Sequence, residues 1–262
     1  MEDIYYEYLR DKDANMHIAL GKSSKSKPHF HKSLEVLYLV SGLMNCKVGD
    51  EEFIAGPDEI VFVHNYYVHS FYPFEEYEKI FFIVPSDYGN DLNKTLQKTT
   101  LPSRLSDAEF NRTLLPLIKK MYKERDTMSH LVRKGYLNVI VGALFEHYPS
   151  KAVKNSSSVE FVVDILCYID EHYSEPITLD ILANHFGYNK YYFSRVFNRY
   201  VKENISNYIN IVRLQHFMRL ASEIETVYIA KLATECGFES LTTFYRYFNK
   251  VYGTTPKNYF AK

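Results

Sequence analysis

The chain of 262 residues contains little cysteine, and it has no hydrophobic run long enough to cross a membrane. Its three cysteines, Cys46, Cys167 and Cys236, are odd in number, widely separated and without the spacing of a metal site. This pattern argues against a disulfide-bonded scaffold and favours a reducing compartment. The N-terminus also lacks the pattern of a signal peptide. We therefore expect a soluble, cytoplasmic protein with no membrane partner.

A strong excess of charge of either sign is also missing. The formal net charge is −1, and residues 159–262 contain 11 Lys and Arg against 11 Asp and Glu. Bulk charge therefore gives no sign of a polyanionic partner. Any contact with nucleic acid has to come from cations placed locally on one surface. The length allows one large domain or two of ordinary size.

The sequence does contain a helix-turn-helix pattern, and this pattern occurs twice. In each copy a short amphipathic helix is followed by a glycine turn and by a helix of the form aromatic-x-Arg-x-Phe. The glycine permits a tight turn, and a small alanine lets the two helices approach closely. Residues 205–221, between the copies, have the pattern of one continuous helix. The equivalent positions are Ala183 and Ala233, Gly187 and Gly237, Phe193 and Phe244, Arg195 and Arg246, and Phe197 and Phe248.

The N-terminal part has a different pattern, with short β-type runs separated by turns. Many short strands at close spacing are typical of a sandwich or barrel. Residues 1–28 are polar and rich in tyrosine, with a basic stretch at 22–27 that we expect to form an exposed loop, and we expect residues 86–105 to be a connecting segment. The strands are expected at 34–40, 44–48, 52–55, 60–63, 68–72 and 79–84.

This β-rich region contains a group of candidate ligand residues, His29, His31, Glu35 and His69. Their arrangement resembles the first cupin motif and the histidine of the second. In cupins, which are small jelly-roll barrels, the equivalent side chains point into the barrel mouth, where they can hold a divalent metal. Imidazole and carboxylate suit Fe, Mn, Ni or Zn. The second motif is incomplete, because Asp58-Glu59 replaces its Gly-Asp step. Three interpretations stay open: a metal site, hydrogen bonding to a polar ligand, or a satisfied polar cluster.

Two helices are expected next. The first begins with a capping box at Ser106 and continues towards residue 125, with Pro116 kinking or breaking it. The second spans 129–147 and has an apolar stripe. These helices either cover the barrel or pair with their copies in a dimer, and the two interpretations are compatible. We expect four parts: a cupin-like sensing barrel at 1–100, a helical dimerisation or covering segment at 101–150, a linker at 151–158, and a DNA-binding domain at 159–262.

The C-terminal hundred residues resemble the AraC/XylS family of bacterial transcription regulators. The motifs that carry the resemblance are Ala233-x-x-x-Gly237-Phe238, Phe244-x-Arg246-x-Phe248 and Gly253-x-x-Pro256-x-x-Tyr259. The resemblance implies an α+β protein of two domains, an N-terminal cupin-like jelly-roll barrel with a helical extension and an all-α domain. In the latter, a linker helix joins two helix-turn-helix units. The sequence departs from the family pattern at Phe217, where a small residue is usual, at Tyr228, which replaces a helix cap, and at Phe260.

The resemblance also implies which residues contact DNA. Two recognition helices at a fixed separation near ~34 Å would enter successive major grooves of B-DNA. Arg195 and Arg246 are the expected base readers, because a guanidinium bonds to guanine O6 and N7 together. The alternative for each arginine is a solvated helix face. The complete set of expected DNA contacts is Lys190, Tyr191, Ser194, Arg195, Ser240, Leu241, Thr242, Thr243, Tyr245, Arg246 and Lys250.

These observations predict a DNA-binding transcription regulator, not an enzyme, whose barrel senses a small polar effector such as a sugar. The expected partners are double-stranded DNA, the effector and a second copy of the chain. No cofactor is expected apart from the metal left open above. One alternative is a regulator without a ligand that uses the barrel only for dimerisation, and another is a metal-dependent cupin enzyme fused to a DNA-binding module. The expected effector-binding residues are His29, His31, Glu35, Tyr38 and His69.

Overall fold

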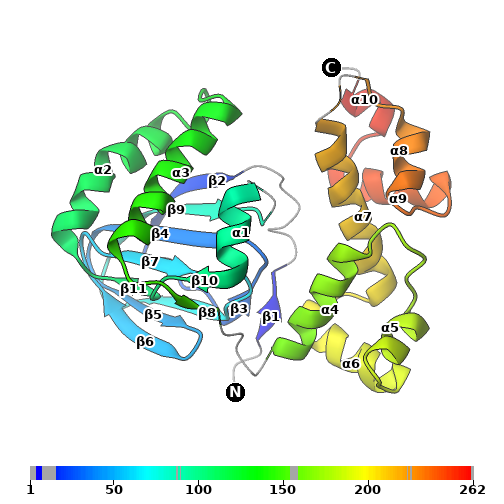
Figure 1. Cartoon of the computed structure of the whole chain (residues 1–262), viewed down its shortest axis with the longest axis horizontal. Helices are drawn as coiled ribbons and strands as arrows, with labels where there is room; N and C mark the ends of the chain where they lie inside the picture. The colour runs from blue at the N-terminus through cyan, green and yellow to red at the C-terminus, as the bar shows by residue number, and fades with distance from the viewer. Residues whose placement is uncertain are drawn as a thin grey trace. The chain divides into compact units, whose positions relative to one another are not determined.

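The computed structural model describes residues 4–7, 16–86, 88, 90–153, 159–222, 224 and 226–260 (Figure 1). The chain divides into two compact units, Met1–Ser157 and Ser158–Lys262. Each unit has its own secondary structure, β-rich in the first and all-α in the second. Within the ranges just given, no helix combines the length and the apolar character that a membrane span requires.

The first unit contains two five-stranded sheets. All pairings in them are antiparallel except that of β1 with β3. In order, one sheet consists of β1 (Tyr5–Tyr6), β3 (His29–Phe30), β8 (His69–Pro73), β5 (Met44–Val48) and β6 (Glu51–Ala55). The other consists of β11 (Arg104–Leu105), β7 (Ile60–Val63), β4 (Leu34–Ser41), β9 (Glu78–Val84) and β2 (His17–Lys22). A separate pair joins β10 (Thr99–Thr100) to β12 (Lys151–Ala152).

Strand β4 is buried on both faces from Leu34 to Leu39, which explains why its sequence is apolar apart from Glu35 and the exposed Ser41 at its end. Leu37 and Leu39 belong to a core that also includes Met44 and Phe71 of the other sheet. Successive residues of a strand point to opposite faces. Val36 therefore lies on the outer face, in a core shared with the helices α2 (Ala108–Lys123) and α3 (His130–His147). The first unit is thus built of three layers, two sheets and a helical layer (Figure 1).

The two covering helices begin one residue from where the sequence places them. Asp107, not Ser106, caps α2, and its side chain accepts a hydrogen bond from the Phe110 amide. Ser129 caps α3 in the same way. Pro116 lies inside α2, which continues through it, so of the two predicted outcomes the break is wrong and the kink stays a prediction. Their apolar faces are buried in the same core as the outer face of the sheet, so these helices cover one side of the sandwich.

Two parts of this unit differ from what the sequence predicts. Residues 17–22, where no strand was predicted, form the edge strand β2, which pairs with β9 along its whole length. The segment 86–105, expected to be a connection, contains α1 (Asn90–Lys98) as well as β10 and β11. Strand β2 lies at the edge of its sheet, α1 has only nine residues, and β10 and β11 have two residues each. Neighbouring strands and helices, not their own periodicity, stabilise them.

The second unit consists of seven helices within its described residues. Figure 1 shows the α5–α6 pair at one end of the long helix α7 and the α8–α9 pair at the other. Both helix-turn-helix predictions and the continuous linking helix are confirmed. The helices are α4 (Glu160–Glu171), α5 (Leu179–His185), α6 (Lys190–Val201), α7 (Ile205–Ser222), α8 (Ile229–Glu235), α9 (Leu241–Tyr252) and α10 (Pro256–Phe260).

Glycine stands at the turn of each helix-turn-helix unit because the backbone there is left-handed. Gly187 has φ +72° and Gly237 has φ +84°. The two turns differ in their surroundings. A Cβ atom on Gly237 would lie 2.8 Å from backbone atoms of Tyr173 and Ser174, whereas a Cβ on Gly187 would meet nothing within 4 Å. Gly237 therefore permits a close approach of two backbones as well as a tight turn.

Candidate DNA interface and ligand site

The recognition helix of the first unit, α6, turns one face inward and leaves the other exposed. Asn189 caps it by accepting a hydrogen bond from the Tyr191 amide. Phe193 and Phe197 are completely buried, whereas Tyr191 and Arg195 lie on the exposed side. The spacing of three to four residues separates the two faces, as expected of a surface helix. The repeated phenylalanines of this helix therefore belong to the core of the unit.

The second recognition helix, α9, repeats this arrangement. Ser240 caps it, Phe244 and Phe248 are buried, and Arg246 is exposed at the position equivalent to Arg195. Of the predicted DNA contacts, Ser194 and Thr243 are half-buried. The structure leaves the other nine exposed: Lys190, Tyr191, Arg195, Ser240, Leu241, Thr242, Tyr245, Arg246 and Lys250.

Some of these exposed groups already have partners within the protein. Lys190 Nζ lies 3.2 Å from Asp180 Oδ1, an exposed ion pair that contributes little to stability. The Ser240 hydroxyl oxygen accepts a hydrogen bond from the Thr243 amide at 3.2 Å. Ser240 therefore holds the first turn of α9 in place, in addition to any contact with a phosphate.

Sequence reasoning missed one cation and two aromatic rings on the first recognition surface. Arg199 is exposed one helical turn after Arg195, and this i, i+4 spacing was visible in the sequence. Tyr188 and Tyr192 stack on each other with ring centroids 5.5 Å apart, and both are exposed. The Arg195 guanidinium lies 5.9 Å from the Tyr192 ring centroid. This contact limits the orientations of the arginine.

Helix α7 fixes both recognition helices through buried contacts at its two ends. Tyr208 packs edge-on against Phe197 of α6, with centroids 5.5 Å apart. Phe217, placed where the family pattern has a small residue, is fully buried 4.6 Å from Phe244 of α9. The buried Arg213 donates hydrogen bonds of 2.8 Å to the carbonyl oxygens of Tyr173 and Glu175. Burial lowers the pKa of this guanidinium.

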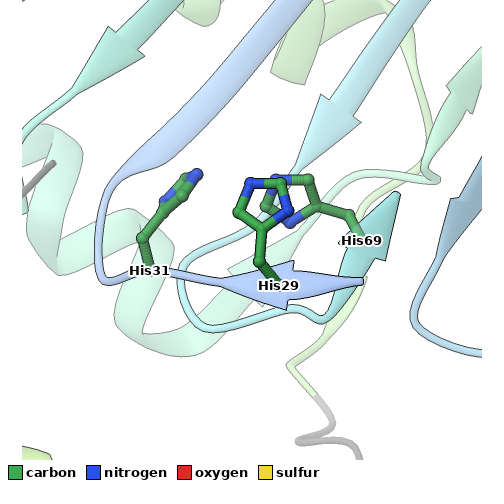
Figure 2. A group of neighbouring side chains, drawn as sticks. All are labelled: His29, His31 and His69. Atoms are coloured by element: carbon green, nitrogen blue, oxygen red, sulfur yellow. The ribbon is translucent and has the colours of Figure 1, made fainter. Parts of the chain in front are cut away.

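In the first unit, three histidines converge at one end of the sandwich (Figure 2). His29 lies on β3 and pairs in register with His69 on β8, while His31 follows β3. One ring nitrogen of each lies within 4.8 Å of those of the other two. All three rings are buried. Glu35, on β4 of the facing sheet, adds a buried carboxylate.

The hydrogen bonds of these histidines determine which ring nitrogen carries the proton. Nδ1 of His29 lies 2.8 Å from the Lys27 carbonyl oxygen, and Nδ1 of His69 lies 2.9 Å from that of Tyr67. Nδ1 of His31 is 3.0 Å from the Ser33 carbonyl oxygen. Because a carbonyl oxygen only accepts, each Nδ1 donates. The Nε2 atom of each neutral ring then carries a lone pair.

The lone pairs face a carboxylate. Glu35 Oε2 lies 3.2 Å from His69 Nε2 and 3.5 Å from His31 Nε2. Two acceptors at this distance need a positive charge between them, either a proton on the imidazole or a metal cation. Burial raises the pKa of Glu35, but His31 and His69, when their Nε2 atoms are protonated, donate hydrogen bonds that outweigh it and hold the pKa well below its usual range.

His29 is held in its neutral form at physiological pH. Burial, together with the charges of His69 and His31, lowers its pKa to about 3. A neutral imidazole nitrogen whose partner Nδ1–H donates to a backbone carbonyl is the arrangement found in metal-binding histidines. Three such nitrogens and one carboxylate fit Fe, Mn, Ni or Zn. The donor set of this chain therefore fits a divalent metal.

The prediction that Tyr38 joins this group is wrong. Alternation along β4 places Glu35 and Tyr38 on opposite faces of the sheet. The Tyr38 side chain lies in the core beneath α2 and α3, and its hydroxyl donates a 2.6 Å hydrogen bond to Asp58 Oδ1. Asp58 and Glu59, which replace the Gly-Asp step of the second cupin motif, form ion pairs with Arg112 and Arg104.

Taken together, the fold and the two exposed recognition helices define a DNA-binding regulator attached to a β-rich domain. Comparisons with known proteins agree. Residues 182–262 match a helix-turn-helix domain family, and residues 19–129 match the AraC-like ligand binding domain family. The regulatory protein SoxS of Escherichia coli strain K12 is 30% identical over 105 residues, which are 39% of this chain and 95% of SoxS.

Other similar proteins differ in how much of the chain they cover. The melibiose operon regulatory protein of Escherichia coli strain K12 is 31% identical over 113 residues, covering 42% of this chain and 37% of that protein. A crystal structure of ToxT from Vibrio cholerae covers 93% of this chain and 97% of its own, at 11% identity and a TM-score of 0.42. The chain belongs to the AraC/XylS family of transcription regulators. It carries an AraC-like ligand-binding domain ahead of its DNA-binding domain.

Proposed function

We propose that this regulator reads DNA through α6 and α9, with Arg195 and Arg246 contacting bases in two successive major grooves. The observation that carries the proposal is the equivalent exposure of these arginines on two capped helices fixed by buried contacts to α7. A guanidinium forms two hydrogen bonds with guanine, so each arginine contributes to base preference. The neighbouring Lys190, Lys250 and hydroxyl groups contact phosphates and set the position on the duplex.

Selection of bound DNA from a random pool tests this proposal. The expected site contains two contacted segments whose centres are about 10 bp apart, the spacing of one helical turn. Arg195→Ala and Arg246→Ala each relax the base preference, and each affects a different one of the two segments. A selected site with only one contacted segment, unaffected by Arg246→Ala, would contradict the use of both helices.

We further propose that the cluster of His29, His31, Glu35 and His69 binds the effector. A hydroxylated metabolite such as a sugar suits buried imidazoles and a carboxylate, and so does a divalent metal. The donation of each Nδ1–H to a backbone carbonyl favours a metal, either alone or holding the small molecule. Occupation of the site shifts the balance between arrangements that do and do not bind DNA.

A thermal-shift screen of purified protein distinguishes the ligands. Metabolites and the chlorides of Mn(II), Fe(II), Ni(II) and Zn(II) are added in turn, with His31→Ala as the control. The effector raises the midpoint temperature of thermal unfolding of the wild type and leaves that of the variant unchanged. If nothing raises the midpoint, the ligand-independent alternative is favoured, in which the first unit serves only for dimerisation.

We also propose that the chain dimerises through the outer face of α3. Leu131 is 79% exposed and Val139 57% exposed on this face, and nothing lies within 4 Å of a Cβ placed on Gly135 or Gly142. An antiparallel pair of these outer faces that crosses between Gly135 and Val139 sets each large side chain near a small residue of the second copy. Light scattering on the wild type and on Leu131→Glu plus Val139→Glu tests this, with a monomeric variant expected. A wild type that is monomeric at micromolar concentration would overturn it.

A further inference from the structure

The N-terminal strand brings a second carboxylate to the histidine cluster. Strand β1 pairs in parallel with β3, with Tyr5 opposite His29 and Tyr6 opposite Phe30. The Glu7 amide extends this pairing with a 2.8 Å hydrogen bond to the Phe30 carbonyl oxygen. Beyond it, the Glu7 side chain turns toward the cluster, and Glu7 Oε2 lies 3.5 Å from His29 Nε2.

Two aromatic contacts hold this strand against the cluster. The Tyr5 ring stacks on the His29 ring at a centroid distance of 5.6 Å and an angle of 20°. Tyr6 is 2% exposed and packs on Phe30, with centroids 5.1 Å apart. Burial of an aromatic side chain fixes the register of so short a strand. The position of the Glu7 carboxylate is therefore built into the fold.

The contact between Glu7 and His29 repeats the relationship between Glu35 and the other two histidines. His29 Nδ1 donates to a carbonyl oxygen, so the Nε2 atom that faces Glu7 carries a lone pair in the neutral ring. A carboxylate oxygen and a nitrogen lone pair repel each other unless a cation lies between them. Glu7 thus faces His29, and Glu35 faces His31 and His69, so each of the three Nε2 atoms has a carboxylate oxygen within 3.5 Å.

The net charge of the occupied site also favours a second carboxylate. A divalent ion held by three neutral imidazoles and Glu35 alone keeps a net charge of +1 in a buried site, which is unfavourable. A second carboxylate makes the site neutral. Three nitrogens and two carboxylate oxygens also suit five- or six-coordinate Mn, Fe or Ni, with a position left for water or an effector oxygen.

We propose that Glu7 is a fifth ligand of a divalent transition-metal ion bound by His29, His31, Glu35 and His69, so that metal binding and docking of β1 stabilise each other. This rests on the proposed metal site. The linkage is reciprocal: bound metal holds the strand in place, and displacement of the strand lowers the affinity for the metal. The state of the site is thereby transmitted to the N-terminal segment of the chain.

Metal titration of the full-length chain tests the proposal. Protein stripped with a chelator is titrated with Mn(II) and with Zn(II) in a calorimeter, as wild type, Glu7→Gln, His69→Ala and Glu52→Gln. Glu52→Gln is the matched control, because Glu52 is an exposed carboxylate on β6 of the same sheet. We expect Glu7→Gln to weaken binding about 10- to 100-fold, Glu52→Gln to have no effect, and His69→Ala to abolish binding.

Hydrogen exchange provides the second readout. Addition of metal slows exchange of the Glu7 amide at least about tenfold in the wild type and not in Glu7→Gln. If the wild type binds neither metal, the proposed metal site fails, and this inference fails with it. If metal binds in the wild type and is lost in His69→Ala, while Glu7→Gln binds like the wild type, the metal site stands and the role of Glu7 is wrong.

Discussion

Phe217 of α7 lies against Phe244 of α9, with ring centroids 4.6 Å apart and both side chains fully buried. The large ring at a position where the family pattern has a small residue is therefore part of the core of the second helix-turn-helix unit. It also makes an edge-on contact with Phe248 and with Phe260, the latter at 6.1 Å. The departure at Phe260 belongs to the same cluster.

Phe217→Ala is expected to lower the free energy of unfolding by about 3–5 kcal/mol, the usual effect of removing a buried phenylalanine. Chemical denaturation followed by circular dichroism measures it. Tyr228→Ala provides the control, because Tyr228 is 70% exposed and its side chain makes no capping hydrogen bond. Equal losses in the two variants would show that Phe217 contributes no more than a surface ring.

The two turn glycines form a matched pair for a second prediction. Alanine at either position adopts a left-handed backbone, which costs about 1–2 kcal/mol. Gly187→Ala should show this loss alone, because its Cβ meets no atom within 4 Å. Gly237→Ala should lose about 1–3 kcal/mol more, because its Cβ lies 2.8 Å from backbone atoms that cannot rotate away. Thermal and urea unfolding of both variants measure the loss of unfolding free energy. Similar losses in the two variants would contradict the close approach of the Gly237 backbone to Tyr173 and Ser174.

The third prediction separates a base contact from a phosphate contact. Arg246→Ala is expected to weaken binding to the selected DNA site by about 1–3 kcal/mol and to relax the preference at one base pair. Arg199→Ala is expected to weaken binding to all sequences alike and to reduce the slope of affinity against salt by about 1. Fluorescence anisotropy on single-base variants of the site, at several salt concentrations, measures both effects. If Arg246→Ala discriminates between bases as the wild type does, Arg246 does not contact a base.

The fourth prediction concerns thiol reactivity. Burial raises the pKa of Cys46 and of Cys236 to about 12, so their thiolate fraction at pH 8 is very small. Both thiols should resist iodoacetamide in the native protein at pH 8 and react fully in guanidinium chloride. Mass spectrometry of the peptides gives the extent of modification at each site. Rapid native labelling of Cys236 would mean that the second helix-turn-helix turn opens readily.

Local sequence patterns are sufficient to predict some features of this fold and not others. The repeated phenylalanines and the continuous helix α7 follow from local periodicity, and the structure buries the former and contains the latter. Strand β2 escaped notice because only one face of an edge strand is buried, and Ile18 is its one buried residue. The incorrect grouping of Tyr38 with Glu35 could have been avoided, since three residues along a strand reverse the face.

Glu7 and the histidine tautomers lay beyond sequence reasoning for a different reason. The position of Glu7 depends on parallel pairing of a two-residue strand with β3, and no local pattern encodes such a contact between distant segments. The protonation of the histidines depends on carbonyl groups of Lys27, Ser33 and Tyr67, whose backbone orientation appears only in the folded chain. The residue types of the site were thus predictable from sequence, but their chemistry was not.

Helix α7 contributes Tyr208 to the packing of α6 and Phe217 to the packing of α9. Neither helix-turn-helix unit therefore possesses a complete hydrophobic interior of its own. A fragment ending before α8 would expose the Phe217 ring to water. A fragment starting within α7, after Tyr208, would remove the ring that packs against Phe197. We therefore expect the two helix-turn-helix units to unfold together in one cooperative transition.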